Sequence, residues 1–172
     1  IAVKKGRDRS GGAWGRFMNT LGSATVLNHT SVCESSKKIG MEPTWGPDIE
    51  TPDFANAKYV LNFGSNILEA AYFHNPLSQR VTEGRVDNHA KIVTFDVRLS
   101  NTAGFSDDWI PVFPGTDGAV ALAMGHVILR EDLQDSEFIE TWTNVTVKEL
   151  KDHYKQFTPE WASKISGVPA ET

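Results

Sequence analysis

KYVLNFGSNILE, at residues 58–69, is the segment around which the rest of the chain can be organised. Its apolar run at 59–63 is rich in strand-forming residues, and Gly64, Ser65 and Asn66 follow as turn and helix-capping residues. The pattern predicts a buried strand that breaks at Gly64 and starts a helix. Such a junction directs the free N–H groups of the helix toward the edge of a sheet, which makes it an anion site. The alternative is a purely structural junction, because every α/β protein contains several.

Two further strand-to-loop junctions follow at the spacing of a doubly wound sheet. Residues 91–96, KIVTFD, predict a second buried strand that ends in Asp96. A carboxylate at that place can accept hydrogen bonds from ribose hydroxyls or from a base edge. Residues 109–113 predict a third strand, and the turn PGTDG at 114–118 leads into an amphipathic helix.

This alternation predicts a single α/β domain over residues 1–172, with a doubly wound, mainly parallel, Rossmann-like sheet and helices on both faces. The strand at 59–63 is expected in the centre, flanked by the other two. Thr116 or Asp117 is expected to cap the helix after the third strand. All three loops then lie at one edge of the sheet, where open α/β folds bind ligands. The GxGxxG signature is absent, so an ordinary NAD site is not expected.

Composition narrows the class of protein. The 172 residues are 40% hydrophobic and 23% charged, which is enough to build a compact core. The net charge of −5 and the lack of a basic run argue against a nucleic-acid partner. No stretch approaches the roughly 18 apolar residues of a membrane span. The chain does not begin with Met, and we expect it to be a fragment of a larger protein.

Near the amino terminus, residues 13–21 predict a helix with one buried apolar face, formed by Trp14, Phe17, Met18 and Leu21. The polar segment 28–38, NHTSVCESSKK, then contains the only cysteine, Cys33, between His29 and Lys38. A thiol beside lysines is expected to have a lowered pKa and to serve as a soft metal ligand or a nucleophile. The alternative is a half-buried cysteine without a role. One Cys and one His supply too few ligands for zinc, but a metal carried by a cofactor stays open.

At these residues the chain resembles the dimethyl sulfoxide reductase family of molybdenum and tungsten oxidoreductases, which carry a bis-molybdopterin guanine dinucleotide cofactor. The resemblance covers about residues 11–172. It rests on four segments in order: LGSATVLNHTSVCESSKKIG, YVLNFGSNILEA, KIVTFDVRLSNTA and WIPVFPGTDGAVALAMGHVIL. The last segment is the most specific. The spacing of His29, Cys33 and Lys38 looks most like the branch that reduces arsenate, tetrathionate, thiosulfate or polysulfide.

The resemblance implies a role for each of these segments. Cys33 would be the protein ligand to molybdenum or tungsten, and His29 and Lys38 would be catalytic contacts to the substrate. The residues that would hold one guanine dinucleotide are Gly64, Ser65, Asn66, Glu69, Asp96, Arg98, Gly115, Thr116 and Asp117.

The resemblance also implies a function for the larger protein. This chain would be the cofactor-binding and metal-ligating domain of a catalytic subunit that transfers oxygen atoms or reduces an oxyanion or a sulfur compound, and it would be inactive alone. A 4Fe-4S cluster is expected in an amino-terminal part that this chain lacks, and an iron–sulfur electron-transfer subunit is the expected partner. The resemblance favours a periplasmic or extracytoplasmic location, with the cytoplasm as the alternative. The alternative functions are a nucleotide-binding Rossmann-like module without a metal and a redox-inert interaction domain.

Overall fold

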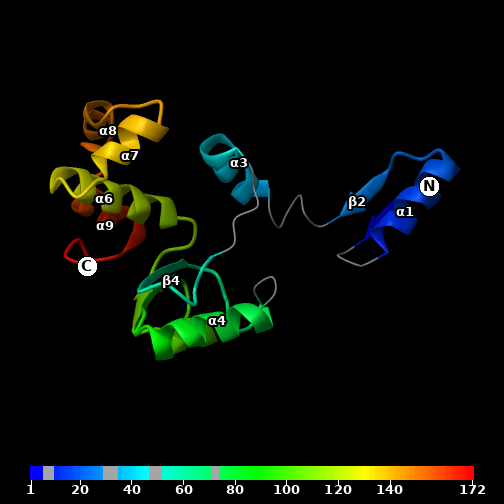
Figure 1. The fold of residues 1–172 in the computed structure, drawn as a ribbon, viewed down its shortest axis with the longest axis horizontal. Helices are drawn as coiled ribbons and strands as arrows, with labels where there is room; N and C mark the ends of the chain where they lie inside the picture. Colours follow the sequence, from blue (N-terminus) through cyan, green and yellow to red (C-terminus); the bar gives the residue numbers. More distant parts are fainter. Residues whose placement is uncertain (6–9, 29–34, 47–51, 71–73) are drawn as a thin grey trace. The chain divides into compact units, whose positions relative to one another are not determined.

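The computed structural model of the protein describes residues 1–5, 10–28, 35–46, 52–70 and 74–172 (Figure 1). The described chain divides into two compact units, Ile1–Pro52 and Asp53–Thr172, and each is described by itself. The prediction of one α/β domain over residues 1–172 stays a prediction.

The first unit contains a short strand–helix–strand element. Strands β1 (Val3–Lys5) and β2 (Val26–Asn28) pair in parallel through helix α1 (Gly11–Leu21), and helix α3 (Ser35–Trp45) follows. Both strands are only three residues long. The small sheet therefore offers little surface against which α1 can pack.

The prediction that α1 buries one apolar face is wrong for three of its four residues. Met18 is buried, at 1% exposure, but Trp14, Phe17 and Leu21 are 38%, 53% and 43% exposed. Trp14 and Phe17 contact each other edge to face, with ring centroids 6.2 Å apart. The helix itself was predicted correctly, but the burial of its apolar face was not. The two short strands cover only one side chain of that face.

The second unit is built on a parallel sheet of three strands, β3 (Tyr59–Phe63), β4 (Lys91–Asp96) and β5 (Asp108–Pro111). Their order in the sheet is β3-β4-β5. The α/β class with parallel strands is therefore confirmed. The expectation that the 59–63 strand is central is wrong, since β4 lies between the other two.

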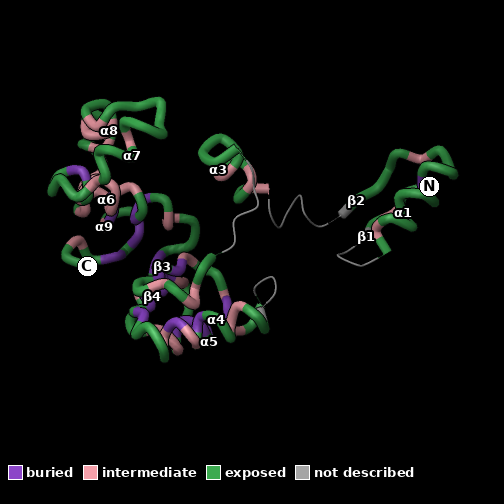
Figure 2. Tube along the Cα trace, in the orientation of Figure 1, coloured by how far each residue is buried: buried purple, intermediate pink, exposed green. Residues whose placement is uncertain are grey.

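Burial explains why β4 is the central strand. The four residues from Ile92 to Phe95 are all buried, with exposures between 0% and 4%, so β4 is covered on both faces (Figure 2). In β3, by contrast, burial alternates: Val60 is buried while Tyr59 and Leu61 are 56% and 48% exposed. A strand that is buried on both faces belongs in the interior of a parallel sheet.

Helices pack on both faces of this sheet, as predicted (Figure 1). On one face Val81 packs with Val60 and Ile92, and on the other Val120 packs with Val93. The helices described in this unit are α4 (His74–Asp87), α5 (Asn101–Phe105), α6 (Asp117–Arg130), α7 (Ser136–Trp142), α8 (Val147–Tyr154) and α9 (Pro159–Ser166). In the parts of the chain that are described, no helix has the length and apolar character needed to cross a membrane.

The prediction that a helix starts directly after Gly64 is wrong. Residues 66–70 form a single turn, in which the Ala70 amide donates to the Asn66 carbonyl at 2.9 Å, and α4 begins at His74. The side chain of Asn62 donates to the Ser65 carbonyl at 2.8 Å. The loop is therefore held both by this single turn and by the Asn62 side chain from the sheet.

Helix α8 begins with a capping box, and this gives a testable pH dependence. The Thr146 hydroxyl accepts from the Glu149 amide, and the Glu149 carboxylate accepts from the Thr146 amide at 2.8 Å. The hydrogen bond from the Thr146 amide lowers the pKa of Glu149 the most, and the Thr146 hydroxyl, which also donates to Glu149 Oε2 at 2.7 Å, lowers it further. Because the pKa is lower in the folded state, this carboxylate stabilises the fold above its unfolded pKa. That stability is lost as the pH falls through its folded pKa.

We expect Thr146→Ala to raise the pKa of Glu149, which an NMR pH titration of the 172-residue chain would measure. Stability should then decline less as the pH falls. Thr158→Ala is the matched control, because the Thr158 hydroxyl caps a different helix, α9, by accepting from the Trp161 amide at 3.2 Å, and its loss should leave Glu149 unchanged. An unaltered Glu149 titration in Thr146→Ala would contradict this assignment.

Candidate functional site

The candidate site lies at the carboxyl edge of the three-stranded sheet. The parallel register pairs Phe63 with Phe95 and Asp96 with Pro111, so the loops after all three strands leave at the same edge. The Gly64 amide extends the pairing by donating to the Phe95 carbonyl at 2.8 Å. The common edge predicted for the three loops is therefore confirmed.

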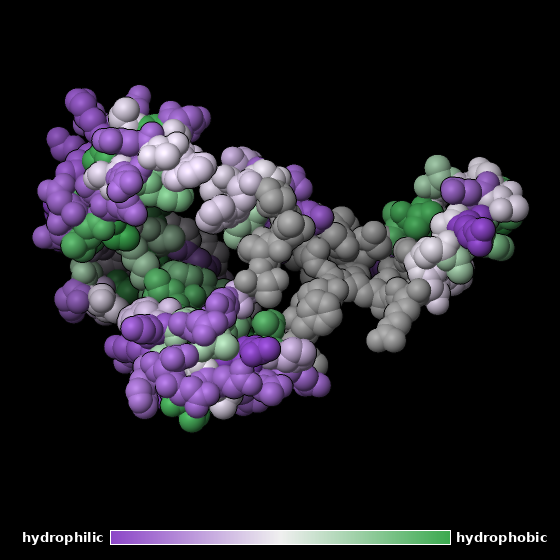
Figure 3. Space-filling view, in the orientation of Figure 1, coloured by the Kyte–Doolittle hydropathy of each residue, from purple (hydrophilic) through white to green (hydrophobic). Residues whose placement is uncertain are grey.

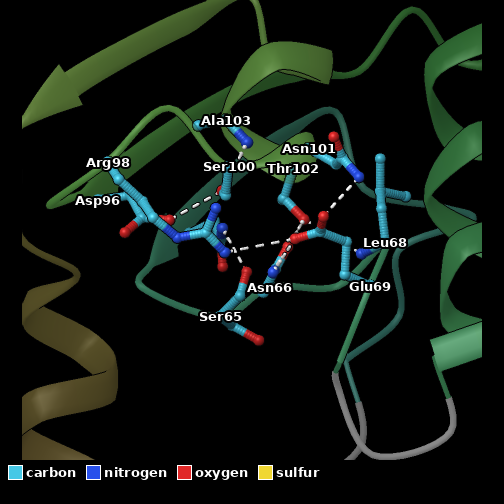
Figure 4. Close-up of polar contacts among 11 residues, drawn as sticks. Ser65, Asn66, Leu68, Glu69, Asp96, Arg98, Ser100, Asn101, Thr102 and Ala103 are labelled. Carbon is cyan, nitrogen blue, oxygen red and sulfur yellow. Dashed lines mark hydrogen bonds and ion pairs between the residues drawn. The ribbon is translucent and has the colours of Figure 1, made fainter.

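Glu69 is the centre of a polar cluster that joins the loop after β3 to the loop after β4 (Figure 4). Its carboxylate accepts from the side-chain amides of Asn66 and Asn101. Arg98 Nη2 lies 3.5 Å from Glu69 Oε2, and the two side chains are 64% and 33% exposed. One carboxylate thus gathers three donor groups, and the predicted residues Asn66, Glu69 and Arg98 lie together. We call this group, including Asn101, the Glu69 cluster.

Asp96 ends the central strand beside this cluster, and its carboxylate is oriented by the next helix. Asp96 Oδ2 accepts from the Ser100 hydroxyl at 2.8 Å. Ser100 is the N-cap of α5, and its hydroxyl also accepts from the Ala103 amide at 3.2 Å. On the other side Trp109 Nε1 donates to the Asp96 carbonyl at 3.1 Å. The end of β4 is therefore tied to both neighbouring segments.

The PGTDG turn contributes from the third strand of the same edge. Thr116 is the N-cap residue of α6 as predicted, but its hydroxyl donates to the Phe113 carbonyl at 2.7 Å and does not bond a helix N–H. Asp117 begins α6, where a negative charge is favourable. Gly115 and Gly64 have positive φ values of 78° and 63°, and a Cβ on either would meet nothing within 4 Å. Both loops therefore present open backbone at the edge.

Sequence reasoning missed four polar residues of this site: Asn62, Ser100, Asn101 and Thr102. Three of them form the run Ser-Asn-Thr directly after Arg98 and Leu99. A polar run that follows a strand at the predicted binding edge was an available signal. Asn62 gave no such signal, because a polar side chain inside a strand is usually expected on a solvent-facing side.

Only part of the predicted metal loop lies within the described residues. His29 and Cys33 lie outside the described residues. Lys38 is half-buried in the first turn of α3 and has an interaction partner. Within the described ranges, no group of three or more His, Cys, Asp or Glu side chains is placed to hold a metal ion.

A cavity of about 540 Å³ in the second unit lies away from the candidate site. It lies between the sheet and helices α6 and α9, beside the contact of Val93 with Val120, and is lined mainly by apolar side chains, among them Leu61 and Met124. Figure 3 shows apolar surface facing the hollow between these two parts. None of the nine predicted cofactor residues lines this cavity. The chemistry of the candidate site therefore belongs to the open edge of the sheet and not to this cavity.

Comparison with known proteins places this chain in one family. The family model described as molybdopterin oxidoreductase matches residues 9–158. The molybdopterin-containing subunit of thiosulfate reductase from Salmonella typhimurium is 36% identical over 153 residues, which cover 87% of this chain and 19% of that protein. The corresponding subunit of arsenate respiratory reductase from a Shewanella species is 32% identical, with 91% and 21% covered. A dimethyl sulfoxide reductase from Haemophilus influenzae is 32% identical, with 91% and 22% covered.

A solved structure agrees with these sequence matches. Acetylene hydratase from Pelobacter acetylenicus superposes with a TM-score of 0.75 at 28% identity, over 93% of this chain and 21% of that one. The chain thus spans about a fifth of the length of the relatives it matches. The match confirms the resemblance and disfavours a metal-free nucleotide module. This chain belongs to the molybdopterin oxidoreductase family.

Proposed function

We propose that this chain binds one pterin guanine dinucleotide and supplies the protein ligand to the metal in a molybdopterin oxidoreductase. The full-length protein would reduce an oxyanion or a sulfur compound, or transfer an oxygen atom, in a two-electron reaction. The observation that carries the proposal is the Glu69 cluster, which joins two loops at the ligand-binding edge of a parallel sheet. The isolated chain is expected to be inactive.

The donors and acceptors of this edge fit the nucleoside end of such a cofactor. Its loops carry the carboxylates of Glu69, Asp96 and Asp117 and the single guanidinium of Arg98. Carboxylates repel phosphates, but they accept strong hydrogen bonds from ribose hydroxyls and from the N–H groups of guanine. The amide and guanidinium donors suit the guanine carbonyl oxygen or a single phosphate oxygen. This balance favours a nucleoside over a bare pyrophosphate.

Family membership implies a molybdenum–pterin cofactor, which supplies two-electron oxygen-atom chemistry at its metal. We propose Cys33 as the protein ligand, because a thiolate is a soft donor and this chain has no other cysteine. Lys38 and His29 would neutralise and orient an oxyanion. The position of Lys38 in the first turn of α3, five residues after Cys33, supports a shared location for these groups.

The larger assembly is part of the same proposal. We propose a bis-guanine-dinucleotide form of the cofactor with molybdenum or tungsten, a 4Fe-4S cluster in another part of the full-length protein, and an iron–sulfur electron-transfer subunit as partner. The relatives named as thiosulfate and arsenate reductases support a small oxyanion or sulfur compound as substrate.

Asp96→Ala in the full-length protein tests the nucleotide site. Losing a charge-assisted hydrogen bond costs about 1.5 to 3 kcal/mol, which corresponds to release of the dinucleotide about ten to a hundred times faster. The measurement is the guanosine monophosphate liberated by acid hydrolysis from desalted protein, followed over time.

Asp108→Ala is the matched control for this experiment. Asp108 lies at the opposite, amino end of the sheet, where it pairs with Lys91 at 2.8 Å and both side chains are 51% exposed. This variant should retain the nucleotide as the wild type does. Equal nucleotide lifetimes in Asp96→Ala and in the wild type would argue that the dinucleotide is bound elsewhere.

A further inference from the structure

A buried hydroxyl group lies directly behind the loop that carries Asn66. Thr102 is 2% exposed, and its Oγ1 donates to Asn66 Oδ1 at 2.9 Å (Figure 4). The same oxygen accepts from the Leu68 amide at 3.1 Å. One side chain from α5 therefore holds both a side chain and the backbone of the loop after β3. Both hydrogen bonds are partly buried, because Thr102 itself is almost fully covered.

These contacts fix the orientation of the Asn66 side-chain amide. An ionised carboxylate can only accept hydrogen bonds, so the Asn66 NH₂ group must face Glu69. The Asn66 oxygen then faces inward and needs a donor, which the Thr102 hydroxyl provides. Without that donor the inward oxygen would be unsatisfied, and only the contact with Glu69 would hold the amide in this orientation.

Thr102 itself is anchored to the centre of the sheet by a chain of hydroxyl contacts. The Ser106 hydroxyl donates to the Thr102 carbonyl at 2.8 Å and lies 2.7 Å from Thr94 Oγ1. Thr94 is fully buried on β4, at 0% exposure, and it also accepts from Asn62 Nδ2 at 3.3 Å. Asn62 holds the Ser65 carbonyl. The loop after β3 is thus fastened to the core strand at two points.

We infer that Thr102 is a positioning residue of the nucleotide site, which holds the Asn66 amide in its contact with Glu69, and through it the Glu69 carboxylate, without touching the ligand. This inference rests on the proposed function, because it assigns the Glu69 cluster to a guanine dinucleotide. The Asn66 and Glu69 side chains are held in place before the ligand binds. The free energy of binding therefore does not include the entropy loss of ordering them.

Two substitutions at Thr102 in the full-length protein separate the effect of the hydroxyl group from the effect of side-chain volume. Thr102→Val keeps the shape and removes the hydroxyl, and it should release the nucleotide about tenfold faster. Thr102→Ser keeps the hydroxyl and should restore a lifetime near that of the wild type. The probe is again guanosine monophosphate liberated by acid hydrolysis. Thr82→Val is the matched control, because Thr82 on α4 bonds only its own helix backbone, at 2.8 Å to the Ser78 carbonyl.

The possible results distinguish the inference from the function on which it rests. If Asp96→Ala loses nucleotide while Thr102→Val keeps it as long as the wild type does, the positioning role is wrong and the nucleotide site stands. If Thr102→Ser loses nucleotide as fast as Thr102→Val, packing and not the hydroxyl is responsible, and the inference is again wrong. If the wild-type protein contains no guanosine monophosphate, both proposals fail.

Asn66→Asp provides a test that leaves the core untouched. This substitution keeps an oxygen toward Thr102 and replaces the NH₂ group that donates to Glu69 by a second carboxylate oxygen. It should release nucleotide at least as fast as Thr102→Val does. A wild-type lifetime in Asn66→Asp would overturn the inference, even if Thr102→Val failed to fold.

Discussion

Replacing Cys33 by alanine in the full-length protein is expected to abolish or sharply reduce the proposed reductase activity while the fold stays intact. The reason is that a thiolate ligand sets the coordination and the potential of a soft metal centre. The X-ray absorption spectrum of the metal should lose one sulfur neighbour at thiolate distance. Cys33→Ser should keep a harder oxygen ligand and shift the potential of the metal.

A structural role for Cys33 predicts the opposite pattern. Alanine would then leave turnover near normal and lower the free energy of unfolding by about 1 kcal/mol through a small cavity. A Cys33→Ala enzyme with full turnover and an unchanged metal spectrum would end the assignment. It would also remove the basis for His29 and Lys38 as substrate contacts.

Gly84→Ala is expected to destabilise the second unit by about 2 kcal/mol, because α4 approaches another segment too closely for a Cβ. A Cβ on Gly84 would lie 2.1 Å from the Phe54 carbonyl oxygen, and a backbone atom cannot move aside as a flexible side chain can. Phe54 in turn packs against the cluster around Val60 and Ile92. Urea unfolding of the 172-residue chain would measure the change.

Gly118→Ala is the matched control and should change stability in the opposite direction. Gly118 also lies in a helix, α6, but a Cβ there would meet nothing within 4 Å. Alanine should therefore stabilise by about 0.5 to 1 kcal/mol through its helix propensity. A Gly84→Ala variant that is as stable as the wild type would contradict this prediction, because it would show that the added Cβ does not clash with Phe54.

Much of this fold follows from short sequence patterns. The boundaries of β3 and β4 were predicted to the residue, and the binding edge followed from the parallel arrangement. The strand order was not predicted, although residues 92–95, IVTF, are buried continuously whereas burial alternates along YVLNF. Both runs are apolar in composition, so the difference depends on which neighbours cover Tyr59 and Leu61, and that is a property of the tertiary structure.

The charged residues of the site could be predicted from the sequence, whereas its buried polar residues could not. Asp96 and Arg98 follow a strand directly, so their place at the edge can be read from spacing. Thr102 and Asn62 act from the interior, and their hydrogen bonds span 36 and 32 residues of sequence, to Asn66 and Thr94. The first pairing depends on how α5 packs on the sheet and the second on the register between β3 and β4, and no local pattern specifies either.

The most direct test of the central claim is a cryo-electron microscopy map of the full-length protein with its own cofactor bound. We expect a guanine nucleotide at the carboxyl edge of β3 and β4, within hydrogen-bond distance of Asn66, Asp96 or Arg98. Density for the nucleotide in the apolar cavity between the sheet and α6, or in another domain with this edge exposed to solvent, would contradict the account.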